Sequence, residues 1–207
     1  MNRHFNHGLN VKEIILKKYP KHIVEVGAFD GSNTKKIASL QEAVGFKFTV
    51  ISDDVKDRIP GVDYIKGISY NALKDFPDES IDICIIDTDH NYWTLIEELK
   101  AVFTKITEGG LILFHDVETF YHDSGITSYG AEFPYPREEI DKLMCRGSTG
   151  CAVIDFLAEM RFNYKLERWV PEYDGACAIR RKTVKHVNLM QYYLNPETKQ
   201  SESVAPC

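Results

Sequence analysis

The sequence of 207 residues predicts an α/β fold: a mostly parallel sheet of seven strands, with helices on both faces and an antiparallel hairpin at its C-terminal end. Three observations predict it. Short runs rich in β-branched residues alternate with segments of helical periodicity, which is typical of parallel sheets. The run IDICIID (81–87) is mostly apolar, as expected for a strand covered on both faces. Turn-forming residues separate FNYKLERWV (162–170) from GACAIRR (175–181), which predicts the hairpin.

A helix, a strand and a second helix are expected at the start of the chain. The amphipathic segment 11–19 stops at a proline and predicts a helix. The β-branched run 21–27 predicts a buried strand. Segment 32–45 repeats apolar residues at helical spacing, so it predicts a helix that Ser32 or Asn33 would cap and that a glycine would end.

The middle of the chain predicts further strands and the most regular helix of the sequence. Strands are expected at FKFTVIS (46–52), VDYIKG (62–67) and IDICIID (81–87). From Tyr92 to Ile106, apolar residues recur every three or four positions and predict one helix face. The other face is expected to hold Thr94, Glu97, Glu98, Lys100 and Lys105. Gly109 and Gly110 are expected to end this helix before a fifth strand, LILFHDV.

One domain is expected to contain all of these strands. The expected divisions are an N-terminal helical segment at 1–19, the domain at 20–182 and a polar tail at 183–207. Within the domain, 117–150 is rich in aromatic and turn-forming residues and is too long for a simple connector. We interpret it as a lid or substrate loop, the alternative being aromatic packing under a long loop. Helical pieces are expected near 138–145 and 151–160.

Composition excludes several classes of protein. The net charge of -6 argues against a nucleic-acid surface, which is usually basic. The five cysteines are scattered without a CxxC pair, so neither a disulfide framework nor a zinc knuckle is indicated, and reduced thiols favour a cytoplasmic location. No apolar run suits a membrane span or a signal peptide, so no membrane association is expected.

A glycine turn follows the first expected strand, in IVEVGAFDGSNT (23–34). Backbone N–H groups and a helix N-terminus in such a turn can meet the negative group of a ligand. A dinucleotide turn would need GxGxxG, but Phe29 and Ser32 stand where the second and third glycines should be. No GK[ST] follows, so a P-loop is excluded as well.

Polar side chains follow two strands that should be neighbours. Asp87, Asp89 and His90 come after the fourth strand, and His115 and Asp116 end the fifth. Because ligands bind at the carboxyl ends of parallel strands, we expect these side chains to converge beside that crevice. Carboxylates with imidazole suit Mg²⁺, Mn²⁺ or a similar divalent ion.

Several motifs together resemble a known family. The turn E-V-G-x-x-x-G (25–31) resembles motif I of class I S-adenosylmethionine-dependent methyltransferases. GISYNALKDFPDESIDICIID (67–87) resembles the segment that follows in that family, with Ile68 at a frequent aspartate position. DTDHNY (87–92) and EGGLILFHD (108–116) resemble the Asp-x-Asp-His-x-Tyr and Pro-Gly-Gly…His-Asp signature of O-methyltransferases that act on macrolide sugars and cephalosporins. More distantly, they are similar to the metal-dependent catechol and caffeoyl-CoA enzymes.

The resemblance covers about residues 20–182 and implies a Rossmann-like class I methyltransferase fold that binds S-adenosylmethionine. The residues that it places at the cofactor are Glu25, Gly27, Ala28, Phe29, Gly31, Asp53, Asp54, Ser69 and Asp87. Either Asp53 or Asp54 would accept the ribose hydroxyls, and Ser69 would contact the adenine.

The resemblance also implies catalytic roles. Asp87 becomes a metal ligand, and His90, three residues later, becomes the general base. Asp116 and His115 complete the expected metal set, although His115 could instead orient a carboxylate. For His90, the alternative is a helix cap or a bond to a backbone carbonyl; for Asp89, the alternatives are the metal, the cofactor's amino group or a helix cap.

The expected function is methyl transfer from S-adenosylmethionine to a hydroxyl of a small molecule, such as a sugar or secondary metabolite, with help from Mg²⁺ or another divalent cation. The alternative is an inactive cofactor-binding or partner-binding module of the same fold. A nucleic-acid methyltransferase is disfavoured by the net charge of -6 and by the lack of an Asn-Pro-Pro-Tyr-like motif after the fourth strand. Relatives of this kind are often dimers or larger, so the resemblance is compatible with a homo-oligomer.

Overall fold

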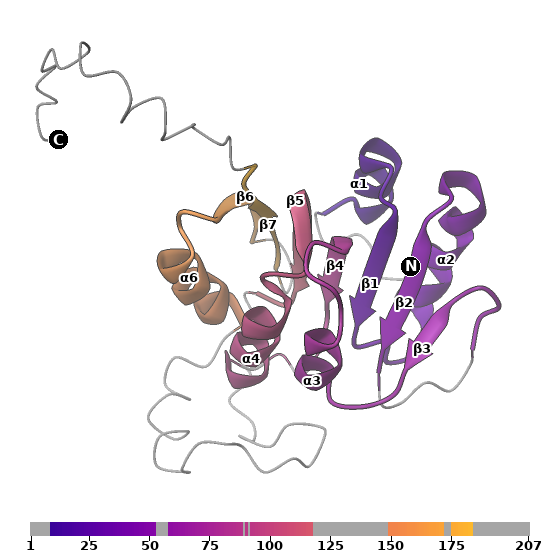
Figure 1. Ribbon diagram of the computed structural model, residues 1–207, viewed down its shortest axis with the longest axis horizontal. Coiled ribbons are helices and arrows are strands. Elements are labelled where there is room, and N and C mark those ends of the chain that lie inside the picture. The colour runs from indigo at the N-terminus through magenta and orange to yellow at the C-terminus, as the bar shows by residue number, and fades with distance from the viewer. Residues whose placement is uncertain are drawn as a thin grey trace, which may run out of the picture.

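The structure is a computed structural model that describes residues 9–52, 58–88, 90, 92–117, 149–171 and 175–183. Its elements in chain order are α1 Val11–Lys18, β1 His22–Val26, α2 Ser32–Val44, β2 Lys47–Ile51, β3 Asp63–Ile65, α3 Ser69–Lys74, β4 Ile81–Ile86, α4 Tyr92–Val102, β5 Ile106–His115, α6 Thr149–Glu159, β6 Tyr164–Val170 and β7 Ala176–Arg181. Figure 1 shows them arranged as one sheet with helices on either side.

The sheet has seven strands in the order β3-β2-β1-β4-β5-β7-β6. The first five strands along the chain pair in parallel, whereas β7 is antiparallel to both β5 and β6. The predicted α/β fold and its C-terminal hairpin are therefore confirmed. The chain order reverses between β1 and β4, and a ligand crevice forms at such a point beside the carboxyl ends of the strands.

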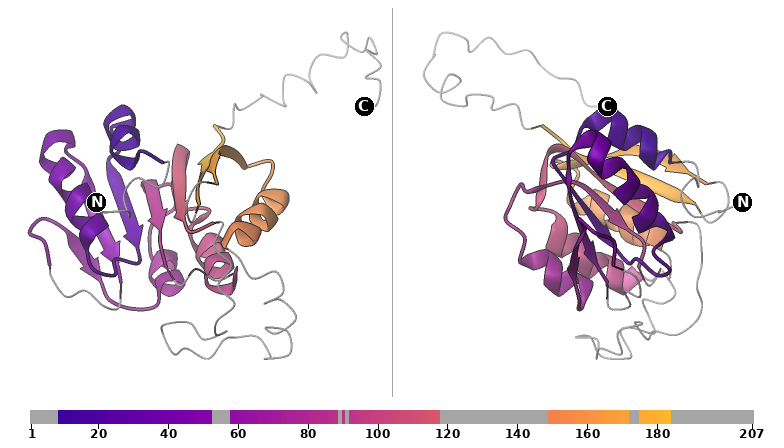
Figure 2. Two further views of the ribbon diagram at one scale, coloured as in Figure 1. Left: turned by 180° about the vertical axis from the view of Figure 1, so that it is seen from behind. Right: turned by 90° about the vertical axis from the view of Figure 1, so that its right-hand side faces the viewer.

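The helices cover both faces of the sheet, as Figure 2 shows from two further directions. Leu9, Ile15 of α1 and Ile37 of α2 belong to the apolar core on one face. Residues of α3, α4 and α6 belong to the core on the other face. On β4, Ile83 and Ile85 face the first core, and Cys84 and Ile86 face the second. β4 is therefore apolar for the reason that the sequence predicts: both faces of the strand are covered.

The end of α4 differs from the expectation. The helix stops at Val102, and Ile106, expected on its apolar face, is the first residue of β5. Gly109 and Gly110 lie inside β5 instead of ending a helix, and the pairing of β4 with β5 shifts register between Ile81 and Ile83. A Cβ on Gly110 would lie 3.0 Å from the carbonyl oxygen of Asp82, so the glycine permits close approach of the two strands at this irregularity.

Two side-chain expectations near the helices were also wrong. The N-cap of α2 is Gly31, at φ 72°, and neither Ser32 nor Asn33 caps the helix. On α4, Glu98 and Thr94 are buried, at 0% and 1% exposure, although the helical pattern placed them on the polar face. The reason is tertiary: α4 packs against α3 and α6 as well as the sheet, so more than one stripe of the helix is covered.

Some expectations fall on residues outside the described ranges, namely most of the 117–150 loop, the helical piece at 138–145 and nearly all of the 183–207 tail. The helix expected at 151–160 is α6, and the strands at its C-terminal side are β6 and β7. Within the described ranges, no helix is long and apolar enough to cross a membrane.

Candidate functional site

Four ionisable side chains meet where β4 and β5 end. Asp87 and His90 follow β4, His115 is the last residue of β5, and Asp116 comes next. Each offers one potential ligand atom, and these four atoms all lie within 4.8 Å of one another. The neighbouring parallel strands place the two pairs together, because their carboxyl ends meet at one edge of the sheet.

The imidazole of His90 lies between the two carboxylates. Its Nε2 atom is 2.8 Å from Oδ2 of Asp116 and 3.0 Å from Oδ1 of Asp87. His115 approaches the same pair from the other strand, with Nδ1 at 2.9 Å from Oδ2 of Asp116 and 3.5 Å from Oδ1 of Asp87. All four side chains are largely buried, with 10% to 26% of each exposed.

This proximity shifts the acid–base equilibria of the cluster. Burial by itself would lower the pKa of His90, but the hydrogen bonds and negative charges of Asp116 and Asp87 outweigh it and raise that pKa to about 10. The same contacts raise the pKa of His115 against the effect of burial. Burial would raise the pKa of Asp116, yet the two histidines hold it well below its usual range. At neutral pH, His90 therefore carries a proton that balances the carboxylates.

Two residues of the cluster adopt a backbone conformation that is uncommon for side-chain-bearing residues. His90 has φ 53° and Asp116 has φ 54°, both in the left-handed region. Such conformations cost on the order of 1–3 kcal/mol and persist only where the surrounding structure holds them. They often accompany binding or catalytic sites, which supports a functional reading of these two positions.

The glycine turn after β1 presses directly against Asp87. Gly27 has φ 84°, and a Cβ there would lie 2.1 Å from the carbonyl oxygen of Asp87. The Asp87 amide in turn donates a hydrogen bond to the carbonyl of Val26 at 2.9 Å. By contrast, a Cβ on Gly31 would meet no atom within 4 Å, so the far end of the turn borders open space. Ala28 is buried, and Phe29 is 85% exposed.

Glu25 lies beneath this turn and is buried, at 1% exposure. The hydroxyl of Thr34 donates a hydrogen bond of 2.6 Å to its Oε2. Burial raises the pKa of Glu25 to about 8; the Thr34 hydrogen bond opposes the shift, and the charge of Asp87 adds to it. The side chain is thus mostly protonated at neutral pH.

Asn33, in the first turn of α2, was missed as a site residue by the sequence reasoning, which treated it as a helix cap. Its Nδ2 donates to Oδ2 of Asp87 at 3.5 Å, and its buried Oδ1 has no hydrogen-bond partner among the described residues. Both Asn33 and Asp87 line a cavity of about 40 Å³ that also reaches His115. The available signal was its position: a polar side chain directly after a glycine turn.

Of the other expected cofactor residues, Ser69 is fully buried at the start of α3, where its hydroxyl donates to Oε1 of Glu98 at 2.5 Å. Asp53, Asp54 and Asp89 lie outside the described residues.

The aromatic pair after the cluster packs into the protein. Tyr92 and Trp93 are 9% and 7% exposed, and their rings meet edge to face with centroids 5.2 Å apart. The Tyr92 hydroxyl also donates to Asp155 of α6 at 2.8 Å. Both side chains therefore contribute to the packing of α4.

Comparison with known proteins finds a family model that matches part of the chain. Residues 21–117 match the model of a family described as a methyltransferase domain. An uncharacterised protein of Acanthamoeba polyphaga mimivirus is 30% identical over 114 residues, which are 47% of this chain and 52% of the viral protein. The chain thus spans about half the length of that curated relative.

Solved structures share the fold. A Staphylococcus aureus protein described as a caffeoyl-CoA O-methyltransferase superposes with a TM-score of 0.57 at 16% identity, covering 88% of this chain and 85% of its own. A methyltransferase of the mycinamycin biosynthetic pathway, solved with Mg and S-adenosylhomocysteine, superposes with a TM-score of 0.55 at 12% identity, covering 83% of this chain and 48% of its own.

Proposed function

We propose a reaction and an acceptor class for this chain, which carries a class I S-adenosylmethionine-dependent methyltransferase domain and resembles small-molecule O-methyltransferases. The reaction is methyl transfer from S-adenosylmethionine to a hydroxyl of a small molecule, such as a sugar or secondary metabolite, assisted by a divalent cation. One observation carries the proposal: Asp87, His90, His115 and Asp116 converge beside the glycine turn.

The glycine turn suits the methyl donor. Gly27 leaves no room for a side chain against Asp87, whereas the space beside Gly31 is open. The buried Oδ1 of Asn33 is an acceptor without a described partner, as a site that binds a hydrogen-bond donor requires. Glu25, Gly27, Ala28, Phe29 and Gly31 would hold the donor here, together with Ser69 and Asp87.

The carboxylate and imidazole cluster suits a divalent cation. Two carboxylates and two imidazoles offer oxygen and nitrogen ligands of the kind that Mg²⁺, Mn²⁺ and related ions accept. Asp87, Asp116 and His115 would hold the ion. The bound groups would supply an electrophilic methyl group and a positive charge that favours ionisation of the acceptor hydroxyl.

Side chains of the protein would align the reactants and remove the proton of the acceptor. Asp87 touches both the glycine turn and the cluster, so it would align the donor side with the acceptor side. His90 would take the proton of the acceptor hydroxyl at Nε2, which requires that the imidazole first be neutral. Asp87 and Asp116 control the protonation of His90, because their negative charges raise its pKa. Any other positive charge that the two carboxylates bind would lower the pKa of His90 and favour the neutral imidazole.

The solved relatives support the choice of hydroxyl and metal. The mycinamycin-pathway enzyme was solved with Mg and S-adenosylhomocysteine, and the S. aureus protein is described as an O-methyltransferase. Both are distant in sequence, so the acceptor is proposed only as a class.

Calorimetry with S-adenosylhomocysteine, with and without Mg²⁺, tests the proposal at its first step. We expect binding of the nucleoside, and methyl transfer from labelled S-adenosylmethionine to a hydroxyl compound in a panel of sugars and secondary metabolites when Mg²⁺ is present. Absence of nucleoside binding would contradict the whole proposal. Undiminished turnover in EDTA would contradict the metal role alone.

A further inference from the structure

We propose that Glu98 is a positioning residue that ties the adenine side of the site to the cluster side. The inference rests on the proposed function and adds a residue to it. Glu98 lies in the middle of α4 and is 0% exposed. In the proposed function, Glu98 binds neither the metal nor the cofactor.

Each carboxylate oxygen of Glu98 accepts a hydrogen bond from a different segment. Oε1 accepts from the hydroxyl of Ser69 at 2.5 Å, and Ser69 is the first residue of α3. Oε2 accepts from the hydroxyl of Thr88 at 3.0 Å, and Thr88 follows Asp87 directly in the loop between β4 and α4. A single side chain thus joins the start of α3 to the loop that carries the cluster.

In this link Glu98 accepts twice, which a carboxylate does directly, whereas a glutamine would have to accept from one hydroxyl and donate to the other. Two hydroxyl donors point at two different oxygens, and a glutamine offers only one carbonyl oxygen as acceptor. A buried acid in a packed helix is unfavourable unless both oxygens are satisfied, so the two hydrogen bonds and the burial of Glu98 depend on each other. Fixing Thr88 also limits the positions open to Asp87 and His90 on either side of it.

The hydroxyls of Ser69 and Thr88 would therefore have different roles. On the proposed function, Ser69 would carry the link on the nucleoside side and Thr88 would carry it on the cation side. Loss of the Thr88 hydrogen bond should loosen Asp87 and His90, and so weaken cation binding more than nucleoside binding. Loss of Glu98 should loosen both, because it serves both hydroxyls.

Calorimetric affinities of the full chain for S-adenosylhomocysteine and for Mn²⁺ test the link. We expect Glu98→Gln to weaken both by about tenfold, the lower end of the effect of groups that orient metal ligands. Thr88→Val should weaken Mn²⁺ binding more than nucleoside binding, and Ser69→Ala should weaken nucleoside binding more than Mn²⁺ binding. Thr88→Ser, which keeps the hydroxyl, should restore the affinity of the wild type for Mn²⁺.

The matched control is Glu97→Gln, which removes an acid from the adjacent position of α4, where Glu97 pairs with Lys100 at 2.9 Å. It should leave both affinities unchanged. Unchanged affinities in Glu98→Gln, or equal losses in Glu97→Gln, overturn the inference. If Glu98→Gln does not fold, unchanged Mn²⁺ affinity in Thr88→Val overturns it. A wild-type chain that binds neither ligand overturns the proposed function and this inference together.

Discussion

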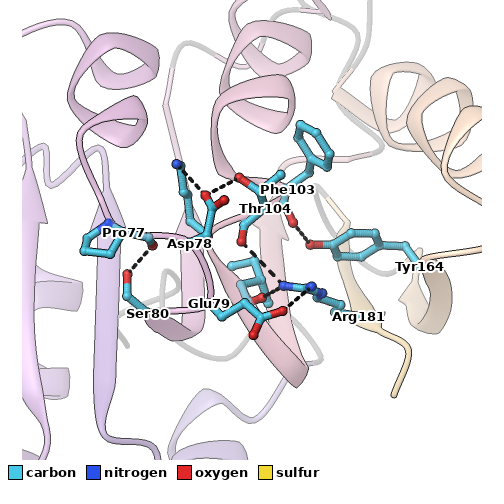
Figure 3. A network of polar contacts seen from close by, with 10 residues as sticks. Pro77, Asp78, Glu79, Ser80, Phe103, Thr104, Tyr164 and Arg181 are labelled. Carbon is cyan, nitrogen blue, oxygen red and sulfur yellow. Dashed lines mark hydrogen bonds and ion pairs between the residues drawn. The ribbon is translucent and has the colours of Figure 1, made fainter. Parts of the chain in front are cut away.

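The two edges of the parallel sheet carry polar networks of opposite design. At the amino edge, before β4 and β5 begin, every drawn acid faces a cation (Figure 3). Asp78 accepts from Lys105 at 2.7 Å, and Glu79 accepts from Arg181 at 2.6 Å. At the carboxyl edge, Asp87 and Asp116 instead share the protonated ring of His90.

The amino edge closes the sheet. Arg181 also donates to the carbonyl of Ile106, and the Tyr164 hydroxyl donates to the carbonyl of Phe103 at 2.5 Å. These bonds connect the hairpin strands to the turn before β5 and to its first residue, through a guanidinium that keeps its positive charge and an uncharged phenol. The network therefore stabilises one arrangement.

The carboxyl edge differs because its positive charge is removable. A proton on His90 balances the two carboxylates, and a proton can be exchanged for a metal ion, whereas the guanidinium of Arg181 cannot leave. Ion pairs thus stabilise one arrangement at the amino edge, whereas those at the carboxyl edge would permit exchange of the proton for a ligand.

The largest expected effect is on catalysis. His90→Ala should lower kcat/KM for an identified hydroxyl acceptor by about 10²–10⁴-fold, the usual contribution of a general base. S-adenosylhomocysteine affinity should change little, because the donor side of the site remains. Steady-state kinetics measures the effect, and Glu79→Gln at the amino edge serves as the control without an effect on kcat/KM. Equal loss in both variants would contradict the contrast.

The free energy of unfolding should depend on pH through Glu25, which lies near the carboxyl edge. Its folded pKa is raised from 4.5 to about 8, so the folded state holds a proton that the unfolded chain releases. This contribution to stability is complete below pH 4.5 and is lost as the pH rises through about 8. Urea denaturation should show the free energy of unfolding falling more steeply with pH in the wild type than in Glu25→Gln. Parallel curves would mean that Glu25 titrates normally.

A stability effect without a catalytic one is expected at the amino edge. Tyr164→Phe removes the donor to the Phe103 carbonyl from a residue that is 2% exposed. Leaving that acceptor unsatisfied should lower the free energy of unfolding by about 1–3 kcal/mol. Denaturant titration measures the loss, and nucleoside affinity should equal that of the wild type. A large fall in nucleoside affinity would show that the two edges are coupled.

The smallest effect is expected from Asp78→Asn. The Asp78 side chain is 66% exposed, so water reaches its ion pair with Lys105 even though the lysine is largely buried, and pairs open to water contribute little. Its change in Tm should be smaller than that of Tyr164→Phe and should shrink further at high salt. A change in Tm as large as that of Tyr164→Phe would mean that the ion pair of Asp78 and Lys105 contributes more to stability than expected.

The sequence pattern predicted the parts of the fold that local rules control. The apolar run of β4 and the turn-separated hairpin are visible in the order of residues alone, and the meeting of Asp87 with Asp116 follows from strand adjacency. The end of α4 was missed because Ile106 happens to continue the helical spacing while it belongs to β5.

Contacts between distant segments could not be predicted. The burial of Glu98 depends on α3 and on the loop after β4, and neither is visible from the pattern of α4. The same holds for Thr34 against Glu25 and for Asn33 against Asp87, since each pair joins α2 to a strand end. Polar residues at such positions resemble surface residues until the packing is known.

Titration calorimetry with Mn²⁺ in buffers of different ionisation enthalpy tests the central claim most directly. We expect Mn²⁺ to bind the wild type at pH 7 with release of about one proton, the one that His90 holds between Asp87 and Asp116. Asp116→Asn should abolish that binding, and Glu79→Gln should not. Binding without proton release, or binding that survives Asp116→Asn, would contradict it.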